Sequence, residues 1–187
     1  NCDVLVMSAT PIPRTMMMTV YGDMDLTLIK EKPKNRKKII TYSKLENKIS
    51  EIISFVKQEI AQKNQIFWVC PLIEESKKIE QKSAVSKYKY LEKYFKKRIG
   101  LIHGSLDKDE RNEILNNFLD RKLDILVSTT VIEVGIDFPN ANVIVIENAD
   151  KYGLSQLHQL RGRVGRGSKE SYCCLLYTSP SPRDREK

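Results

Sequence analysis

Short apolar runs alternate with amphipathic stretches along most of the chain. Apolar runs of strand length predict strands at 39–42, 65–70, 99–104, 124–130, 142–148 and 172–177. The segments between them carry apolar residues at helical spacing. They predict helices from the capping-box signature at Ser43 and Glu46 to about Ala61, from about Ser83 to Lys97, from Asp107 to Leu119, and from Leu154 onward.

This alternation predicts an α/β fold with a parallel sheet and helices on both faces. The strands are continuous apolar runs, as expected for strands that are buried on both sides. The chain opens inside a strand-like run at 4–7, which indicates a longer protein, and a short helix is predicted at 16–21. We divide the chain into the end of one domain (1–29), a basic, proline-bearing linker (30–38), a second domain (39–177) and a disordered or non-native tail (178–187).

The overall charge is positive. Lysine and arginine number 32 against 24 acidic residues, a net charge of +8, which is compatible with a polyanionic partner but does not identify one. Much of the excess is lysine between Lys77 and Arg98, a pattern more typical of a solvated helix face than of a binding site.

Cysteine usage favours a reducing compartment. Cys2, Cys70, Cys173 and Cys174 form no C-x-x-C pair, so we expect reduced, mostly buried thiols and a cytosolic protein. The sequence contains neither a signal-peptide pattern nor an apolar run of membrane length.

Polar residues follow several of the predicted strands. Because ligands bind beyond the carboxyl ends of parallel strands, these residues are candidates for a site. His103-Gly104 follows one strand and Ser128-Thr129-Thr130 another. Their hydroxyls and backbone N–H groups suit phosphate oxygens, and the glycine permits close approach.

Two further groups complete the candidate set. Gly135 and Asp137 place a carboxylate on a tight loop, where it can accept a hydrogen bond from a ribose hydroxyl. Arg163 and Arg166 stand among glycines in "RGRVGRG", and their multi-donor charges suit phosphate groups.

Each candidate also has a purely structural interpretation. Ser128 to Thr130 can cap the segment that follows, His103 can be a hydrogen-bonded structural histidine, and Asp137 can be a turn residue before Pro139. The glycines at 162, 165 and 167 can form a plain loop. The order and strand-end placement of the whole set favour a functional site over these separate interpretations.

Five segments in this order resemble motifs of superfamily 2 helicase motors. They are SATPIPRT (8–15, motif III), WVCPLIEES (68–76, motif IV), LIHGSLDKDER (101–111, a nucleic-acid-contacting motif), DILVSTTVIEVGIDFPNA (124–141, motif V) and QLHQLRGRVGRG (156–167, motif VI). Within the superfamily, YGDMDLTLI (21–29), VCPLIEES (69–76) and VIENADKYGLSQLHQLRGRVGRG (145–167) resemble the RecG group of bacterial ATP-dependent DNA helicases. The resemblance covers roughly Val4 to Tyr177.

The resemblance implies a RecA-like second motor domain, preceded by the end of a first one, with ATP bound between the two. It implies that Arg163 and Arg166 are arginine fingers, with Gln159 facing the phosphates beside them. Gly135 and Asp137 would form the ribose site. Ser8 and Thr10 would couple the ATP state to domain closure. The implied contacts to the DNA backbone are His103, Gly104, Ser128, Thr129 and Thr130.

The implied cofactor is ATP with Mg²⁺, the metal being held by the first motor domain. The implied partners are branched or fork DNA and the upstream motor and wedge domains of the same protein. The implied setting is a monomer in the bacterial cytoplasm, away from the membrane, acting in recombination and repair. The sequence departs from a whole motor, because it contains no G-x-x-x-x-G-K-[ST] loop and no D-E-x-H-type stretch. We therefore expect the chain alone to be inactive.

Three alternatives remain open. A transcription-repair coupling translocase shares "TPIPRT" and a similar motif VI, although "YGDMDL" and "VCPLIEES" favour the RecG group. A non-enzymatic binding module would keep the fold without catalysis, and the presence of Arg163, Arg166 and Asp137 argues against it. An RNA helicase usually opens motif VI with His-Arg, where this sequence has Gln159-Leu160.

Overall fold

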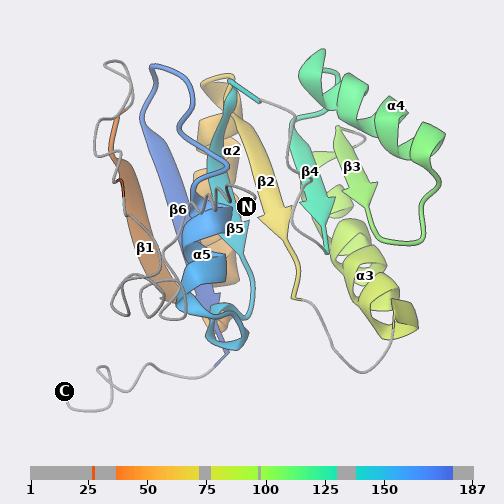
Figure 1. Cartoon of the computed structure of the whole chain (residues 1–187), viewed down its shortest axis with the longest axis horizontal. Helices are drawn as coiled ribbons and strands as arrows, with labels where there is room; N and C mark the ends of the chain where they lie inside the picture. Colours follow the sequence, from red (N-terminus) through yellow and green to blue (C-terminus); the bar gives the residue numbers. More distant parts are fainter. Residues whose placement is uncertain (1–26, 28–36, 72–76, 97, 130–137, 179–187) are drawn as a thin grey trace, which may run out of the picture.

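A computed structural model describes residue 27 and residues 37–71, 77–96, 98–129 and 138–178. These residues form a six-stranded parallel sheet with the order β1-β6-β5-β2-β4-β3 (Figure 1). The strands are β1 (Ile39–Leu45), β2 (Gln65–Val69), β3 (Ile99–Ile102), β4 (Ile125–Ser128), β5 (Ala141–Ile146) and β6 (Ser171–Tyr177). The helices are α2 (Ile49–Ala61), α3 (Lys77–Phe95), α4 (Lys108–Leu119) and α5 (Leu154–Arg161), with 3-10 turns η1 (Glu46–Lys48) and η2 (Ala149–Lys151).

Helices cover both faces of the sheet, as the sequence predicts. Val56 of α2 and Leu91 of α3 belong to the apolar cluster on one face. Phe118 of α4 and Leu160 of α5 belong to the cluster on the other face. Figure 1 shows α5 in front of the sheet and α2 behind it. The central strands β2, β4 and β5 are buried at every position, which explains their continuous apolar runs.

Of the two helix starts predicted from capping residues, the one at Ser43 is wrong. Ser43 lies inside β1 and pairs with Leu175 of β6, so its backbone is extended and it caps no helix. Helical structure begins only at Glu46, and its N-cap residue Leu45 makes no side-chain cap. Pairing along a neighbouring strand outweighs the local capping preference here. The start at Asp107 is confirmed, because its carboxylate accepts a hydrogen bond from the Glu110 N–H at 2.8 Å.

The predicted burial of cysteine is confirmed for the three cysteines that the structure describes. Cys70, Cys173 and Cys174 are buried and form no disulfide. Cys173 and Cys174 point to opposite faces of β6, into different apolar clusters, as expected for neighbours in a strand. Burial raises the pKa of Cys173 to about 11 and that of Cys174 to about 12, so both are unreactive thiols at neutral pH.

Several predicted features lie outside the described residues. They are the strand at 4–7, the helix at 16–21, Cys2, most of the linker at 30–38 and nearly all of the tail. The division into domains therefore stays a prediction. Within the described parts of the chain, no helix combines the length and the apolar character needed to cross a membrane.

Candidate functional site

Two adjacent strands end side by side at the carboxyl edge of the sheet. β3 and β4 pair so that Ile102 lies opposite Ser128. The Thr129 N–H donates a hydrogen bond to the Ile102 carbonyl, with 3.4 Å between nitrogen and oxygen. Since His103 follows Ile102 directly, the structure brings together the strand-end residues that the sequence singles out, His103, Ser128 and Thr129.

The Thr129 side chain is buried without a hydrogen-bond partner among the residues that the structure describes. Thr129 is 1% exposed, and its Oγ1 makes no hydrogen bond to any residue that the structure describes. Leaving a buried hydroxyl unsatisfied costs about 1–3 kcal/mol, so such groups are rare and need an explanation. A phosphate oxygen of a bound ligand is an acceptor that this hydroxyl would suit.

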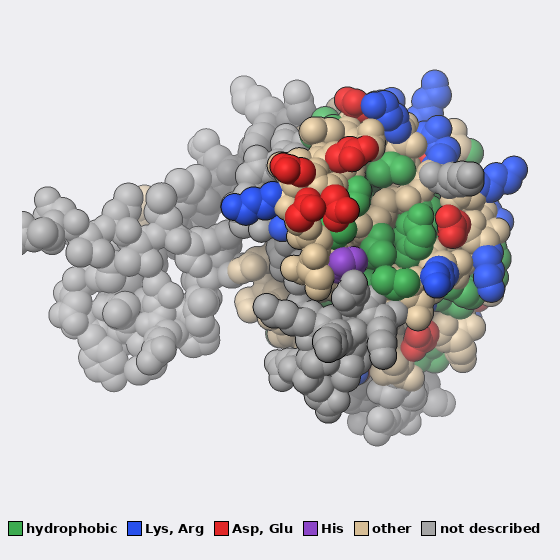
Figure 2. Space-filling view, turned by 90° about the vertical axis from the view of Figure 1, so that its right-hand side faces the viewer, with side chains coloured by type: hydrophobic (Ala, Val, Ile, Leu, Met, Phe, Trp, Pro, Cys, Tyr) green, Lys and Arg blue, Asp and Glu red, His purple; other side chains and the backbone are tan. Residues whose placement is uncertain are grey.

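Open space and mixed charge at the end of β3 favour contact with a small group over a broad basic surface for DNA. A Cβ placed on Gly104 would meet no atom within 4 Å. The His103 Nδ1 accepts a hydrogen bond from the Ser105 N–H at 3.3 Å, which fits the structural interpretation of His103 and leaves the rest of the ring available. Asp109 and Glu110 make the first turn of α4 acidic. Figure 2 shows acidic, basic and hydrophobic side chains mixed on this side of the molecule.

The arginine segment, residues 161–167, lies near the amino ends of the strands, opposite to the carboxyl ends where His103 and Thr129 lie. In Figure 1, α5 runs back from the carboxyl ends of the strands toward their amino ends. Gly165 sits against the first residues of β1 and β6: a Cβ placed on it would lie 3.0 Å from Ile39 Cγ1 and 3.5 Å from Ser171 Cβ. The carboxyl-end rule that places His103, Ser128 and Thr129 therefore does not extend to Arg163 and Arg166.

The glycines pack this segment instead of making it a plain loop. Gly165 has φ = +76°, a conformation that favours glycine. A Cβ on Gly167 would lie 2.7 Å from the Pro139 carbonyl oxygen, so only a hydrogen fits there. Val164 and Leu160 are 0% and 2% exposed and anchor the segment in the core. The interpretation of these glycines as a plain, solvated loop is wrong.

Two of the three arginines in the packed segment, Arg163 and Arg166, influence each other electrostatically. Burial, and then the charge of Arg166, lowers the pKa of the Arg163 guanidinium, which is half-buried. An anion within reach of both groups would relieve their repulsion. Gln159 and Arg166 are exposed, while the Arg161 guanidinium contacts the His158 ring, with 3.0 Å between nitrogens.

Part of the predicted site lies outside the described residues. This part comprises Ser8, Thr10, Thr130, Gly135 and Asp137. The ribose site and the coupling residues therefore stay predictions. Among the described residues, no group of three or more His, Cys, Asp or Glu side chains could hold a metal ion.

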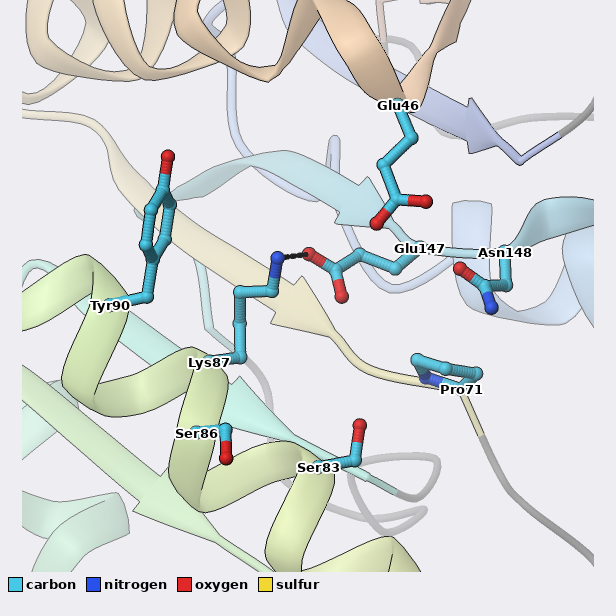
Figure 3. Close-up of a pocket in the computed structure, with 8 residues that line it drawn as sticks. All are labelled: Glu46, Pro71, Ser83, Ser86, Lys87, Tyr90, Glu147 and Asn148. Carbon is cyan, nitrogen blue, oxygen red and sulfur yellow. Dashed lines mark ion pairs between the residues drawn. The ribbon is translucent and has the colours of Figure 1, made fainter.

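Sequence reasoning missed a buried ion pair at the carboxyl edge. Glu147 follows β5 directly, is 5% exposed, and accepts on Oε1 from Lys87 Nζ (2.7 Å) and Trp68 Nε1 (2.9 Å). The pair lines a hollow of about 390 Å³ together with Glu46 and Asn148. Figure 3 shows these side chains around it. Burial raises the pKa of Glu147 despite the attraction of Lys87, which works in the opposite direction.

One signal in the sequence could have pointed to this pair. Glu147 is an acidic residue that directly ends an apolar strand, and Trp68 lies in another buried strand. A buried carboxylate needs partners. The pattern cannot say which lysine of α3 supplies the charge. Lys87 therefore departs from the expectation that the lysines of this stretch form only a solvated face.

Comparison with known proteins decides the family. The model of the family described as the helicase conserved C-terminal domain matches residues 47–168. This chain belongs to that family. The matched range contains α2 to α5, the ends of β3 and β4, and the whole arginine segment. One family model therefore covers both the central part of the sheet and the arginine segment of this helicase C-terminal domain.

Two curated relatives carry the RecG name. The chain is 53% identical over 176 residues to the ATP-dependent DNA helicase RecG of Thermotoga maritima, covering 93% of this chain and 23% of that protein. It is 46% identical over 187 residues to RecG of Bacillus subtilis, covering 99% of this chain and 27% of that protein. The predicted resemblance to RecG is confirmed. The chain spans about a quarter of the length of these relatives.

Solved structures agree with the sequence comparison. A structure described as RecG bound to a three-way DNA junction matches with a TM-score of 0.77 and 49% identity, over 98% of this chain and 24% of that one. Domain 2 of the DEAD-box helicase Mss116p, solved on an RNA duplex, matches with a TM-score of 0.55 and 23% identity, over 74% of this chain and 53% of that one. The second likeness shows the fold alone. The RecA-like fold class predicted from the motifs is confirmed.

Proposed function

We propose that this chain is the second motor domain of an ATP-dependent DNA helicase that acts on branched DNA, including replication forks, in recombination and repair. Similarity to RecG proteins over nearly the whole chain supports this proposal, as does the likeness to RecG on a three-way junction. In the proposal, the upstream motor domain and a wedge domain belong to the same protein, which works as a monomer in the bacterial cytoplasm.

The observation that carries the proposal is the packed arginine segment. Arg163 and Arg166 stand on a backbone that requires glycine at 165 and 167, and the charge of Arg166 acts on Arg163. Fixed donors of this kind stabilise the charge that develops on a phosphoryl group in transfer. We therefore assign Arg163 and Arg166 as the arginine fingers of an ATP site, with Gln159 beside them.

The remaining site residues receive separate roles in the proposal. Asp137 and Gly135 form the ribose site, and Ser8 and Thr10 couple it to domain closure. Mg²⁺ is assigned to the first motor domain, which supplies the carboxylate and phosphate-loop groups that ATP hydrolysis needs. Contacts to the DNA backbone are assigned to His103, Gly104, Ser128, Thr129 and Thr130. Because backbone contacts carry no sequence information, they suit a motor that moves along any DNA.

Replacing one finger tests the proposal in the complete protein. Arg163→Ala should lower DNA-stimulated ATP turnover by about 10³-fold, the effect expected when an arginine finger is lost, with DNA affinity nearly unchanged. Arg161→Ala is the matched control, because its guanidinium contacts His158 on the same helix. ATP turnover and DNA binding are measured on both variants. Unchanged turnover in Arg163→Ala would contradict the finger assignment, whereas the absence of turnover in the wild type would favour a non-enzymatic binding module.

A further inference from the structure

The connection between β5 and α5 is tied to the end of β2 by three hydrogen bonds. The Glu147 N–H donates to the Val69 carbonyl (2.9 Å), and Trp68 Nε1 donates to Glu147 Oε1 (2.9 Å). The Tyr152 hydroxyl donates to the Cys70 carbonyl (3.0 Å). Residues 68–70 therefore hold the chain at both ends of the short turn that leads from β5 into α5.

The turn itself leaves little freedom between these ties. Asn148 takes a left-handed conformation (φ 48°, ψ 50°), which redirects the chain from β5 into η2. The Tyr152 N–H donates to the Ala149 carbonyl at 3.3 Å, and the Gly153 N–H donates to Gln156 Oε1 at 3.0 Å. The first turn of α5 thus follows the position of Tyr152.

The same end of β2 is bonded to the strands that carry the DNA-contact candidates. The Cys70 N–H donates to the Ser128 carbonyl at 2.8 Å, and the Thr129 N–H donates to the Ile102 carbonyl at 3.4 Å. Cys70 therefore reaches β4 through its N–H group and Tyr152 through its carbonyl. Hydrogen bonds and short covalent links join the end of β3 to the start of α5.

Helix α5 connects Tyr152, near the carboxyl ends of the strands, with Arg163, near their amino ends. Its eight residues span about 12 Å, and Arg163 follows the helix by two residues. The Arg163 N–H donates to the Leu160 carbonyl at 3.0 Å, so Arg163 is still bonded to the last turn. A change in the direction of α5 at Tyr152 would therefore shift the Arg163 guanidinium.

We propose that Tyr152 is a positioning residue for the arginine fingers. Its hydroxyl, held by the Cys70 carbonyl, sets the direction of α5 and so places Arg163 toward the phosphates of ATP. The link through Cys70 also makes that placement depend on the end of β4, where Thr129 has its unsatisfied hydroxyl. This inference rests on the function proposed above, because it takes Arg163 as a finger.

The test is Tyr152→Phe in the complete protein, assayed by single-turnover ATP hydrolysis at saturating branched DNA. The hydrolysis rate constant should fall about fivefold, the equivalent of roughly 1 kcal/mol and of one hydrogen bond. The KM for ATP and the Kd for DNA should change by less than about twofold, because no ligand contact is lost. Tyr88→Phe is the matched control, since the Tyr88 hydroxyl donates only to Glu92 along α3, at 3.5 Å, among the contacts that the structure describes. Its rate constant should stay at the wild-type value.

A double-mutant cycle separates positioning from a general loss of structure. Arg163→Lys keeps the charge but loses the planar donor set. It should therefore lower the rate constant even though Tyr152 is unchanged. If Tyr152 acts through Arg163, Tyr152→Phe should have no further effect in the Arg163→Lys background. A fivefold loss that persists in that background overturns the inference, as does a wild-type rate for Tyr152→Phe alone. A wild-type rate for Arg163→Lys contradicts the proposed function itself, so the two failures are distinguishable.

Discussion

Two regions differ in how completely the protein fills their hydrogen bonds and their space. They are the ends of β3 and β4 and the arginine segment. At the strand ends, the Thr129 hydroxyl has no partner among the described residues and the space beside Gly104 is open. In the arginine segment, Val164 is fully buried and Gly167 lies against the Pro139 carbonyl. The first region leaves a polar group without a partner among the described residues and leaves space beside a glycine. The second is fixed in advance by its own packing.

This difference suits the two roles proposed for the regions. A backbone contact to DNA must accept any sequence and can gain from a group that binding satisfies. A finger must hold its charge in one place before the reaction begins, because electrostatic stabilisation depends on preorganisation. Burial first, and then the charge of Arg166, lowers the pKa of Arg163, as expected for a side chain held in a packed segment.

The largest expected effect on stability is the loss of a glycine in the packed region. Gly165→Ala places a Cβ at φ +76° and 3.0 Å from Ile39 Cγ1. The free energy of unfolding, measured with urea, should fall by about 2 kcal/mol. Gly104→Ala, the matched substitution in the open region, should change it by less than about 0.5 kcal/mol. Equal losses from the two substitutions would remove the contrast between the regions.

The next effect should have the opposite sign for stability. Thr129→Val replaces an unsatisfied buried hydroxyl with a methyl group of similar size. The free energy of unfolding should stay constant or rise by up to about 1 kcal/mol, because a desolvation cost is removed. In the complete protein, the stimulation of ATP turnover by DNA should fall more than the unstimulated turnover. An equal loss of both rates would indicate a folding defect instead of a lost DNA contact.

The smallest effect expected is a pH dependence of stability that arises from Glu147, in the connection between β5 and α5. Burial raises the pKa of Glu147, so the folded state binds its proton more tightly than the unfolded state does. The stability of the wild type relative to Glu147→Gln should therefore decrease as the pH rises above 4.5, the ordinary pKa of the group, and level off above the folded pKa. Urea unfolding of both proteins across this range measures the difference. A rising difference would mean that the attraction of Lys87 outweighs burial.

Local sequence signals predicted the sheet and most of its helices. The continuous apolar runs of β2, β4 and β5 indicated buried parallel strands, and Asp107 marked the start of α4. Ser43 failed as a cap because pairing with β6 decides its conformation. That pairing depends on a strand more than a hundred residues away, which a local pattern cannot report.

The positions of some candidate residues were predictable, but their arrangement in space was not. The strand ends placed His103 and Thr129 correctly, because parallel strands share one carboxyl edge. Arg163 lies near the amino ends of the strands, because α5 leads the chain back to the start of β6. The rule about carboxyl ends therefore does not apply to it. The Lys87–Glu147 pair joins residues 60 apart, and the Trp68–Glu147 bond joins residues 79 apart. Only the fold brings such residues together.

ATP hydrolysis by the 187-residue chain alone tests the central claim most directly. The claim is that this domain supplies arginine fingers to an ATP site whose phosphate-binding half lies on another domain. The chain should therefore show no ATP turnover above background, with or without branched DNA, in a coupled phosphate-release assay. DNA-stimulated turnover that disappears in Arg163→Ala would contradict the claim, because the site would then be complete within these residues.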